Sequence, residues 1–125
     1  MATLNEAKYY RMQHVTGPGC VLVSLRFGKM PDSGPLVTIR TTPDRWSEPG
    51  MDIGSYVAEA LDGVSEVNRE LGISLEVAEI EVVPDDYPTI GQVRYCAMLI
   101  ARHVAGSTPG RLKSSEERSR TSRCT

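Results

Sequence analysis

The chain has 125 residues with a formal net charge of −2, and 40% of its residues are hydrophobic and 24% charged. A chain of this length forms one domain and buries roughly two thirds of the surface that its unfolded form exposes. It has no apolar run near the roughly 20 residues of a membrane-spanning helix and no signal-peptide pattern at its start, so we expect a cytoplasmic protein without membrane association.

Three segments near the N-terminus have the composition and alternation of β-strands: residues 9–15 (YYRMQHV), 20–27 (CVLVSLRF) and 36–42 (LVTIRTT). In the second and third segments, alternate apolar residues share one face, as the two-residue repeat of a strand requires. A TGPG sequence separates the first two segments and supplies turn conformations, which predicts a hairpin.

After the loop at residues 43–50, apolar residues recur at three- and four-residue steps, which predicts an amphipathic helix. Its apolar stripe comprises Ile53, Tyr56, Val57, Ala60, Leu61, Val64, Val67 and Leu71. Gly72 follows the stripe and is the expected left-handed C-terminal cap.

Residues 73–83 (ISLEVAEIEVV) predict a fourth strand whose apolar residues change register near Ala78. A one-residue slip would turn half of the apolar side chains outward, so we predict a β-bulge at that position. Pro84 ends the strand.

The next helix is expected to begin at a capping box, Thr89-x-x-Gln92, in which each side chain satisfies the backbone N–H of the other. One side of this helix carries Val93, Cys96, Ala97, Ile100, Ala101 and Val104, and Gly106 closes it. Asp85 and Asp86 are adjacent in the loop before it, which favours a turn over an acid–base pair.

The element order β-β-β-α-β-α predicts an α+β two-layer sandwich, with a four-stranded mixed sheet, two helices on one face and the other face open. Residues 1–105 would form this single domain. Residues 106–125 are polar and basic, so we expect a disordered tail that is either solvated or held by an anionic partner.

Three stretches, GPGCVLVSLRF (17–27), IGSYVAEALDGVSEVNRELGISLEVAEIEVV (53–83) and DDYPTIGQVRYCAMLIARHVA (85–105), resemble domain IV of bacterial elongation factor G, a member of the ribosomal protein S5 domain 2-like fold. The resemblance implies a role in translation, with the loop at residues 85–89 as an RNA-contacting tip. The family tip carries a histidine and small polar residues, whereas Asp85 and Asp86 of this chain repel phosphate. The chain also lacks a GxxxxGK[ST] nucleotide-binding loop, so the resemblance does not carry the translocase activity.

The open sheet face is the main candidate binding surface. Tyr9, Arg11, Arg26 and Arg40 are expected to face away from the helices, where a tyrosine and three arginines would suit stacked bases and phosphates. Glu79 and Glu81 are expected on the same face, where they could instead neutralise Arg26 or Arg40 as cross-strand pairs.

The remaining candidate binding residues lie in loops. Trp46 either covers an edge of the core or contacts a ligand, and Tyr87, Thr89 and Gln92 lie at the strand–helix junction. The three cysteines have no metal-binding spacing, and we interpret them as free thiols. Cys96 and His103 make at most a two-ligand fragment, so we expect no metal, no cofactor and no catalytic residue.

The sequence thus favours a non-catalytic binding module, with the ribosome or RNA as the partner that the resemblance implies. Two alternatives stay open. One is a small enzyme or enzyme subunit with a pocket between residues 42–50 and 85–92. The other is a structural protein that forms a homodimer through its open sheet face.

Overall fold

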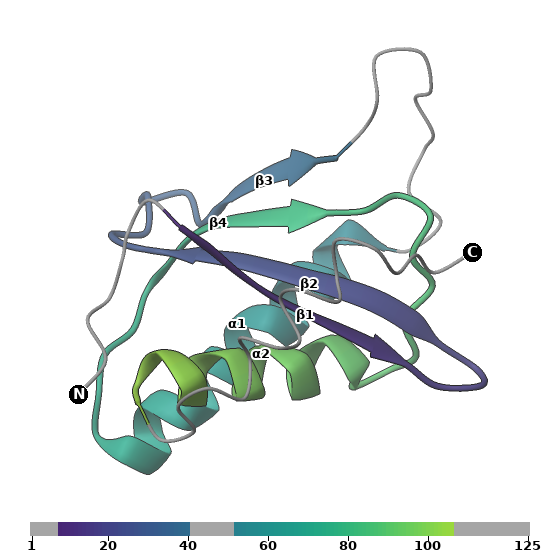
Figure 1. Ribbon diagram of the computed structural model, residues 1–125. Helices are drawn as coiled ribbons and strands as arrows, with labels where there is room; N and C mark the ends of the chain where they lie inside the picture. Colours follow the sequence, from purple (N-terminus) through teal and green to yellow (C-terminus); the bar gives the residue numbers. More distant parts are fainter. Residues whose placement is uncertain (1–7, 41–51, 107–125) are drawn as a thin grey trace.

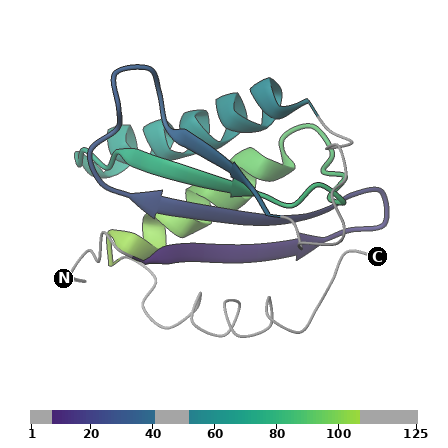
Figure 2. The same cartoon turned by 90° about the horizontal axis from the view of Figure 1, so that it is seen from above.

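The computed structural model describes residues 8–40 and 52–106. Its elements are β1 (Tyr9–Val15), β2 (Cys20–Phe27), β3 (Leu36–Ile39), α1 (Ile53–Leu71), β4 (Val77–Val82) and α2 (Gln92–Val104). The strands form one sheet in the order β1-β2-β4-β3, and both helices lie on the same face of it (Figure 1; Figure 2). The predicted α+β two-layer sandwich is confirmed. Trp46 and the tail beyond Gly106 lie outside the described residues.

The sheet is mixed, as predicted. β1 and β2 form an antiparallel hairpin, β2 and β4 are antiparallel, and β3 and β4 are parallel, with α1 as their connection. The hairpin turn is closed by a hydrogen bond from the Thr16 N–H to the Gly19 carbonyl, 2.8 Å. β1 and β3 are therefore the edge strands.

The predicted bulge at Ala78 is present. Arg26 pairs with Glu79 while Phe27 pairs with Val77, so Ala78 is the extra residue of β4. Val77 and Ala78 are both buried, at 1% and 6% exposure, which shows how the extra residue keeps both apolar registers inside.

β4 is shorter than the predicted strand at residues 73–83. The side-chain amide of Asn68 donates to the Leu75 carbonyl and accepts from the Leu75 N–H, both at 2.9 Å. Because this side chain takes both backbone groups of Leu75, Leu75 does not pair with a strand through its backbone.

The helices cover the sheet unequally. α2 contacts β1 and β2, and α1 contacts β4, but no contact between a helix and β3 is found among the described residues. Leu36 and Val37 of β3 are consequently 55% and 40% exposed, although the strand alternation is that of a half-buried strand. An edge strand outside the helical layer has nothing to bury its apolar side chains against.

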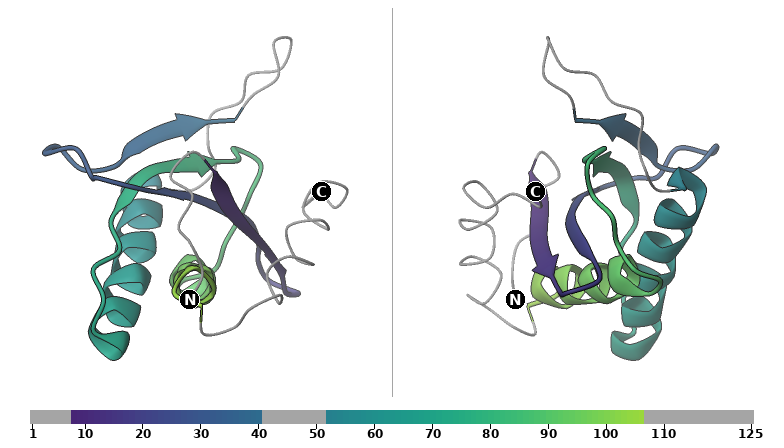
Figure 3. Two further views of the ribbon diagram at one scale, coloured as in Figure 1. Left: turned by 60° about the vertical axis from the view of Figure 1, so that its left-hand side comes forward. Right: turned by 90° about the vertical axis from the view of Figure 1, so that its right-hand side faces the viewer.

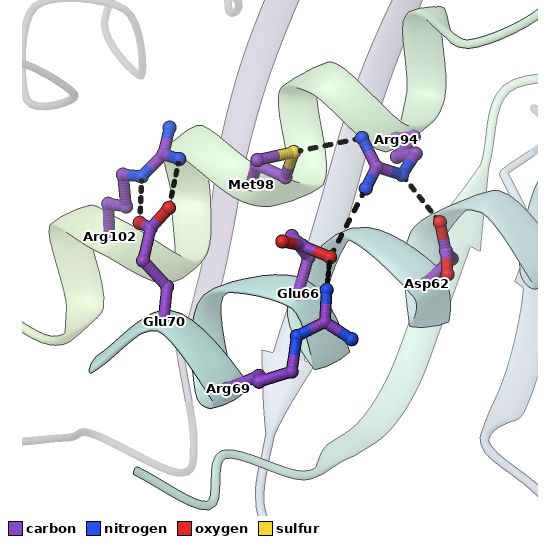
Figure 4. Close-up of polar contacts among 7 residues, drawn as sticks. All are labelled: Asp62, Glu66, Arg69, Glu70, Arg94, Met98 and Arg102. Carbon is purple, nitrogen blue, oxygen red and sulfur yellow. Dashed lines mark hydrogen bonds and ion pairs between the residues drawn. The ribbon is translucent and has the colours of Figure 1, made fainter. Parts of the chain in front are cut away.

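α1 and α2 pack against each other on the sheet and cross at a marked angle, because Figure 3 shows α1 lengthwise where α2 is seen almost end-on. Along their exposed seam, Arg94 pairs with Asp62 and Glu66, and Arg102 pairs with Glu70 (Figure 4). These pairs join three successive turns of α1 to two turns of α2, at Arg94 and Arg102.

The ends of α1 follow from the sequence. Asp52 is the N-cap and accepts the N–H of Gly54 at 3.0 Å, and Gly72 ends the helix in the left-handed conformation (φ 67°, ψ 37°), as predicted. The start of α2 differs from the prediction. Its N-cap is Gly91, not Thr89. Because glycine has no side chain, the N-cap residue itself makes no side-chain hydrogen bond to the helix.

The predicted capping box is only half formed. Gln92 Oε1 accepts the Thr89 N–H at 2.9 Å, but the Thr89 hydroxyl donates to the same oxygen at 3.3 Å instead of accepting from the helix. Glu59 of α1 supplies the acceptors instead, because its carboxylate accepts the N–H groups of Gly91 and Arg94 at 3.0 and 3.2 Å. The cap of α2 is therefore a tertiary contact.

Candidate functional site

Two of the three arginines predicted on the open sheet face, Arg11 and Arg26, form ion pairs within the sheet. Arg11 pairs with Glu81 at 3.0 Å and Arg26 pairs with Glu79 at 3.1 Å. The Arg11 guanidinium also lies 5.0 Å from the centre of the Tyr9 ring. The neutralisation of Arg26 by a cross-strand glutamate is confirmed, and the two pairs together carry no net charge.

The hydrogen bonds of this face shift the pKa values of both Tyr9 and Glu79. Burial, with the hydrogen bond to Glu79, raises the pKa of Tyr9 to about 12. Hydrogen bonds from Thr38 and then from Tyr9 lower the pKa of Glu79 below its usual value. Glu79 therefore stays charged and paired with Arg26, and a phosphate group could bind Arg26 only by displacing Glu79.

The sheet face is also less open than predicted. Ser24 and Leu22, on its central strand β2, are 0% and 7% exposed. Arg40 lies at the end of β3 and is exposed, and its backbone N–H donates to the Val82 carbonyl at 2.8 Å. This face carries charged pairs instead of the apolar centre that homodimer interfaces usually have.

The other predicted residues, Tyr87, Thr89 and Gln92, come together at the N-terminal end of β2, where the loop after β4 meets the β1–β2 hairpin. Tyr87 exchanges two backbone hydrogen bonds with Cys20, at 3.0 and 3.3 Å. The Gln92 side-chain nitrogen contacts His14 Nδ1 at 2.9 Å and donates to the carbonyls of His14 and Gly19 at 3.2 and 3.3 Å. Gln92 is therefore a buried structural link, not a surface contact.

Asp86 is also structural. It is 3% exposed, and its carboxylate accepts the Leu22 N–H at 2.8 Å, whereas Asp85 is exposed. Asp85 and Asp86 therefore differ in role, because only Asp85 is a surface residue of the predicted turn. On the same residue of β2, the Leu22 carbonyl accepts the Tyr56 hydroxyl at 3.2 Å. Burial raises the pKa of Tyr56, so its hydroxyl stays protonated and can donate this hydrogen bond.

Asp86 and Tyr56 therefore replace a neighbouring strand at this point of the sheet. β4 pairs with β2 only along Ser24–Phe27, so Leu22, which pairs with β1 on its other side, lies beyond the end of the β2–β4 ladder. A buried backbone group without a partner is costly, and the two side chains satisfy both groups. The loop is thereby fastened to β2 and α1.

Four exposed apolar side chains lie on or beside this fastened loop, and we call them the junction patch: Val15, Tyr87, Ile90 and Tyr95, which are 62%, 53%, 99% and 48% exposed. Val15 is the strand partner of Cys20, which in turn pairs with Tyr87. The Tyr95 ring lies 5.0 Å from the ring of His14. These contacts place the patch at one end of the molecule.

A cleft adjoins the junction patch. It is lined by Asp52, Ser55, Tyr56, Glu59, Tyr87, Pro88, Thr89, Ile90 and Val93, and its volume is about 260 Å³. One wall comes from the first turns of α1 and the other from the loop that precedes α2. The sequence predicted a pocket between residues 42–50 and 85–92, and its first wall lies outside the described residues.

The described residues give no support to metal or thiol chemistry. No group of three His, Cys, Asp or Glu residues among them could hold a metal ion. Cys96 is buried, and burial raises the pKa of its thiol to about 12, so a thiolate would be scarce at neutral pH. Cys20 is disulfide-bonded, so its interpretation as a free thiol is wrong. Within residues 8–40 and 52–106, no helix is long and apolar enough to cross a membrane.

Sequence reasoning missed Val15, Ile90 and Tyr95 as surface residues and Glu59 and Asp86 as structural ones. Ile90 and Tyr95 did carry a signal, because both are apolar and neither belongs to the stripe of α2. An apolar residue outside the stripe has no core to enter. Glu59 and Asp86 carried none, since their partners are distant in sequence.

Comparison of the chain with protein-family models, with curated proteins and with solved structures gives no match. The α+β architecture therefore stands on the structure alone, and the resemblance to domain IV of elongation factor G stays a prediction.

Proposed function

We propose that the protein is a non-catalytic binding module that contacts its partner through the junction patch. The observation that carries the proposal is the exposure of four apolar side chains, Val15, Tyr87, Ile90 and Tyr95, at one end of the fold. Large apolar side chains gathered on a surface mark interaction sites. Tyrosine in particular is enriched at the centres of protein interfaces.

The frame beneath the patch supports the same function. The loop that bears Tyr87 and Ile90 is tied to β2 by the backbone pair with Cys20, by Asp86 and by Gln92. A surface that is already ordered loses little conformational entropy when it binds. The patch therefore combines exposed apolar area with a preorganised backbone.

The charges around the patch favour a protein over a nucleic acid. Asp85 is exposed in the loop, and Asp52 and Glu59 line the adjoining cleft. Phosphate binding needs unpaired lysines or arginines, and Arg11 and Arg26 are paired with glutamates. Association with the ribosome, which the resemblance implies, is a narrower form of this proposal and would involve a ribosomal protein at the patch.

Affinity capture with matched variants tests the proposal. The full-length chain, its Ile90→Ser variant and its Leu71→Ser variant would each be immobilised and exposed to lysate of the host organism at physiological salt. Ile90 is 99% exposed at the patch and Leu71 is 41% exposed at the other end of α1, so both variants should fold. Bound proteins would be identified and quantified by mass spectrometry.

We expect one partner or complex to be depleted at least roughly tenfold by Ile90→Ser, since an interface loses about 1.5–3 kcal/mol with a fully buried isoleucine. Leu71→Ser should capture it like the wild type. Equal recovery by all three proteins, or equal depletion by both variants, would contradict the proposal. Absence of ribosomal components from the captured set would remove the ribosomal form of it.

A further inference from the structure

The cleft beside the junction patch supports a more specific inference, which rests on the proposed function. We propose that the cleft binds a peptide segment of the partner protein in which a lysine or arginine stands next to an apolar residue. The cleft has an acidic part, formed by Asp52 and Glu59, and an apolar part, formed by Tyr87, Ile90 and Val93.

The acidic part consists of two carboxylates whose positions are fixed. Asp52 accepts the N–H of Gly54 and the hydroxyl of Ser55, both at 3.0 Å. Glu59 accepts the N–H groups of Gly91 and Arg94 at 3.0 and 3.2 Å. Each of these oxygens accepts one of these bonds and has lone pairs for a further donor. A cationic side chain would therefore meet acceptors that need no reorganisation.

The charge balance of the cleft favours one cation. Its lining contains Asp52 and Glu59 and no lysine, arginine or histidine. The two carboxylates lie at the N-termini of α1 and α2, each of which contributes roughly +0.5 elementary charge. The sum is about −1, which suits a single lysine or arginine and disfavours phosphate.

The size of the cleft indicates a side chain as the occupant. Its volume of about 260 Å³ lies below the roughly 300–1,000 Å³ that is typical of small-molecule pockets. Ile90 and Tyr87 stand at its apolar side with 99% and 53% of their surface exposed. An apolar residue next to the lysine or arginine of a peptide would cover the Ile90 and Tyr87 side chains. A small amine ligand without such a neighbour would leave both side chains exposed to water.

Fluorescence polarisation with labelled peptides tests this inference. The probe is a nine-residue Gly/Ser peptide with a central Arg-Leu pair, and two matched peptides replace the pair with Gln-Leu or Arg-Ser. The protein is the full-length chain, tested up to about 1 mM, so that binding as weak as about −4 kcal/mol is detected.

The variants separate charge from apolar contact and from folding. Asp52→Asn removes a charge and keeps the helix cap, because asparagine caps as well as aspartate. Ile90→Ser removes an exposed apolar side chain. Asp32→Asn is the control, since Asp32 is exposed in the β2–β3 connection at the far end of the sheet.

We expect saturable binding of the Arg-Leu peptide that weakens with added salt. Asp52→Asn and the Gln-Leu peptide should each lower affinity roughly two- to fivefold, the size of one exposed ion pair. Ile90→Ser and the Arg-Ser peptide should each lower it by up to roughly tenfold. Asp32→Asn should bind like the wild type.

Two results would overturn the inference: no saturable binding of the Arg-Leu peptide, or an equal loss for Asp52→Asn and Asp32→Asn. The chain's own tail contains Arg111, Leu112 and Lys113. If Arg111→Ser with Lys113→Ser raised probe affinity, the tail would compete for the cleft, and the assignment to a partner protein would be wrong. Capture that depends on Ile90 without peptide binding would leave the proposed function standing and reject only this inference.

Discussion

Replacement of Gly63 by alanine should push α1 and α2 apart. Gly63 is buried in the middle of α1, and a Cβ atom at that position would lie 2.5 Å from the Arg94 carbonyl oxygen and 3.0 Å from the Ala97 Cβ. Real Cβ atoms essentially never come within 3.0 Å of another group. The nearest atom belongs to backbone, so it cannot rotate away, and the helices themselves must separate.

Two opposing effects set the size of the change. Alanine is a better helix former than glycine by about 1 kcal/mol, which favours the variant. Overpacking of a core typically costs about 1–3 kcal/mol, and a shift of a whole helix lies at the upper end of that range. We therefore expect Gly63→Ala to lower the free energy of unfolding by about 1–2 kcal/mol, measured by urea denaturation followed by circular dichroism.

Gly54→Ala is the matched control in the same helix. A Cβ at Gly54 would meet only Asp52 Oδ1, at an ordinary 3.4 Å. That variant should leave stability unchanged or raise it by up to about 1 kcal/mol, because the propensity gain is unopposed. If Gly63→Ala stabilised the protein as much as Gly54→Ala, the close packing of α1 against α2 would be wrong.

Three further predictions concern polar side chains that form hydrogen bonds between elements of the fold. Gln92→Ala should lower the free energy of unfolding by about 2–4 kcal/mol in the same assay, because one buried and two part-buried backbone groups lose their partner. A loss below about 1 kcal/mol would refute the role of Gln92 as a link. Asp86→Ala should lower the free energy of unfolding by about 1–3 kcal/mol, because the buried Leu22 N–H loses its acceptor. Asp85→Ala should change it by no more than about 0.5 kcal/mol, because Asp85 is exposed. Equal losses for the two variants would contradict the structural role of Asp86. Glu79→Gln should destabilise the protein at neutral pH, and the difference from wild type should shrink as the pH falls below about 4.5, because the pKa of Glu79 is lower in the folded state and its contribution is lost as the group is protonated. A difference that is constant with pH would show that the Glu79 charge does not stabilise the sheet.

Local patterns predicted the elements that depend on local chemistry. The bounds of β1 and β2 follow from alternation, the end of α1 follows from Gly72, and the bulge at Ala78 follows from the change of register. Each of these features is fixed by residues within a few positions of one another. The periodic pattern therefore contains enough information to place them.

Features that depend on strand order or on distant partners escaped prediction. Val37 has the alternation of a buried strand residue, but β3 lies at the edge of the sheet beyond both helices. Thr89 has the spacing of a helix cap, but Glu59 of another helix caps α2 and Gly91 is its N-cap. Asp86 has the sequence context of a surface turn. It is buried because the Leu22 N–H, beyond the end of the β2–β4 ladder, donates its hydrogen bond to the Asp86 carboxylate.

The candidate site combines both kinds of feature. Tyr87 was predicted as a binding residue and is exposed at the junction, whereas Gln92 was predicted there and is buried. The sequence predicted binding residues at this junction because it shows a loop between a strand and a helix. It could not separate the residues that fasten the loop from those that the loop presents, since that distinction depends on the position of the hairpin.

The most direct test of the junction patch is hydrogen–deuterium exchange of the full-length protein, free and bound to the partner recovered by capture. Binding at the patch predicts slower exchange in peptides that cover residues 13–16 and 87–95, with no change in residues 66–72 at the far end of α1. Unchanged exchange at residues 87–95, or slowing confined to residues 66–72 or to the sheet face around Arg11 and Arg26, would contradict the proposal that this protein binds its partner through the junction patch.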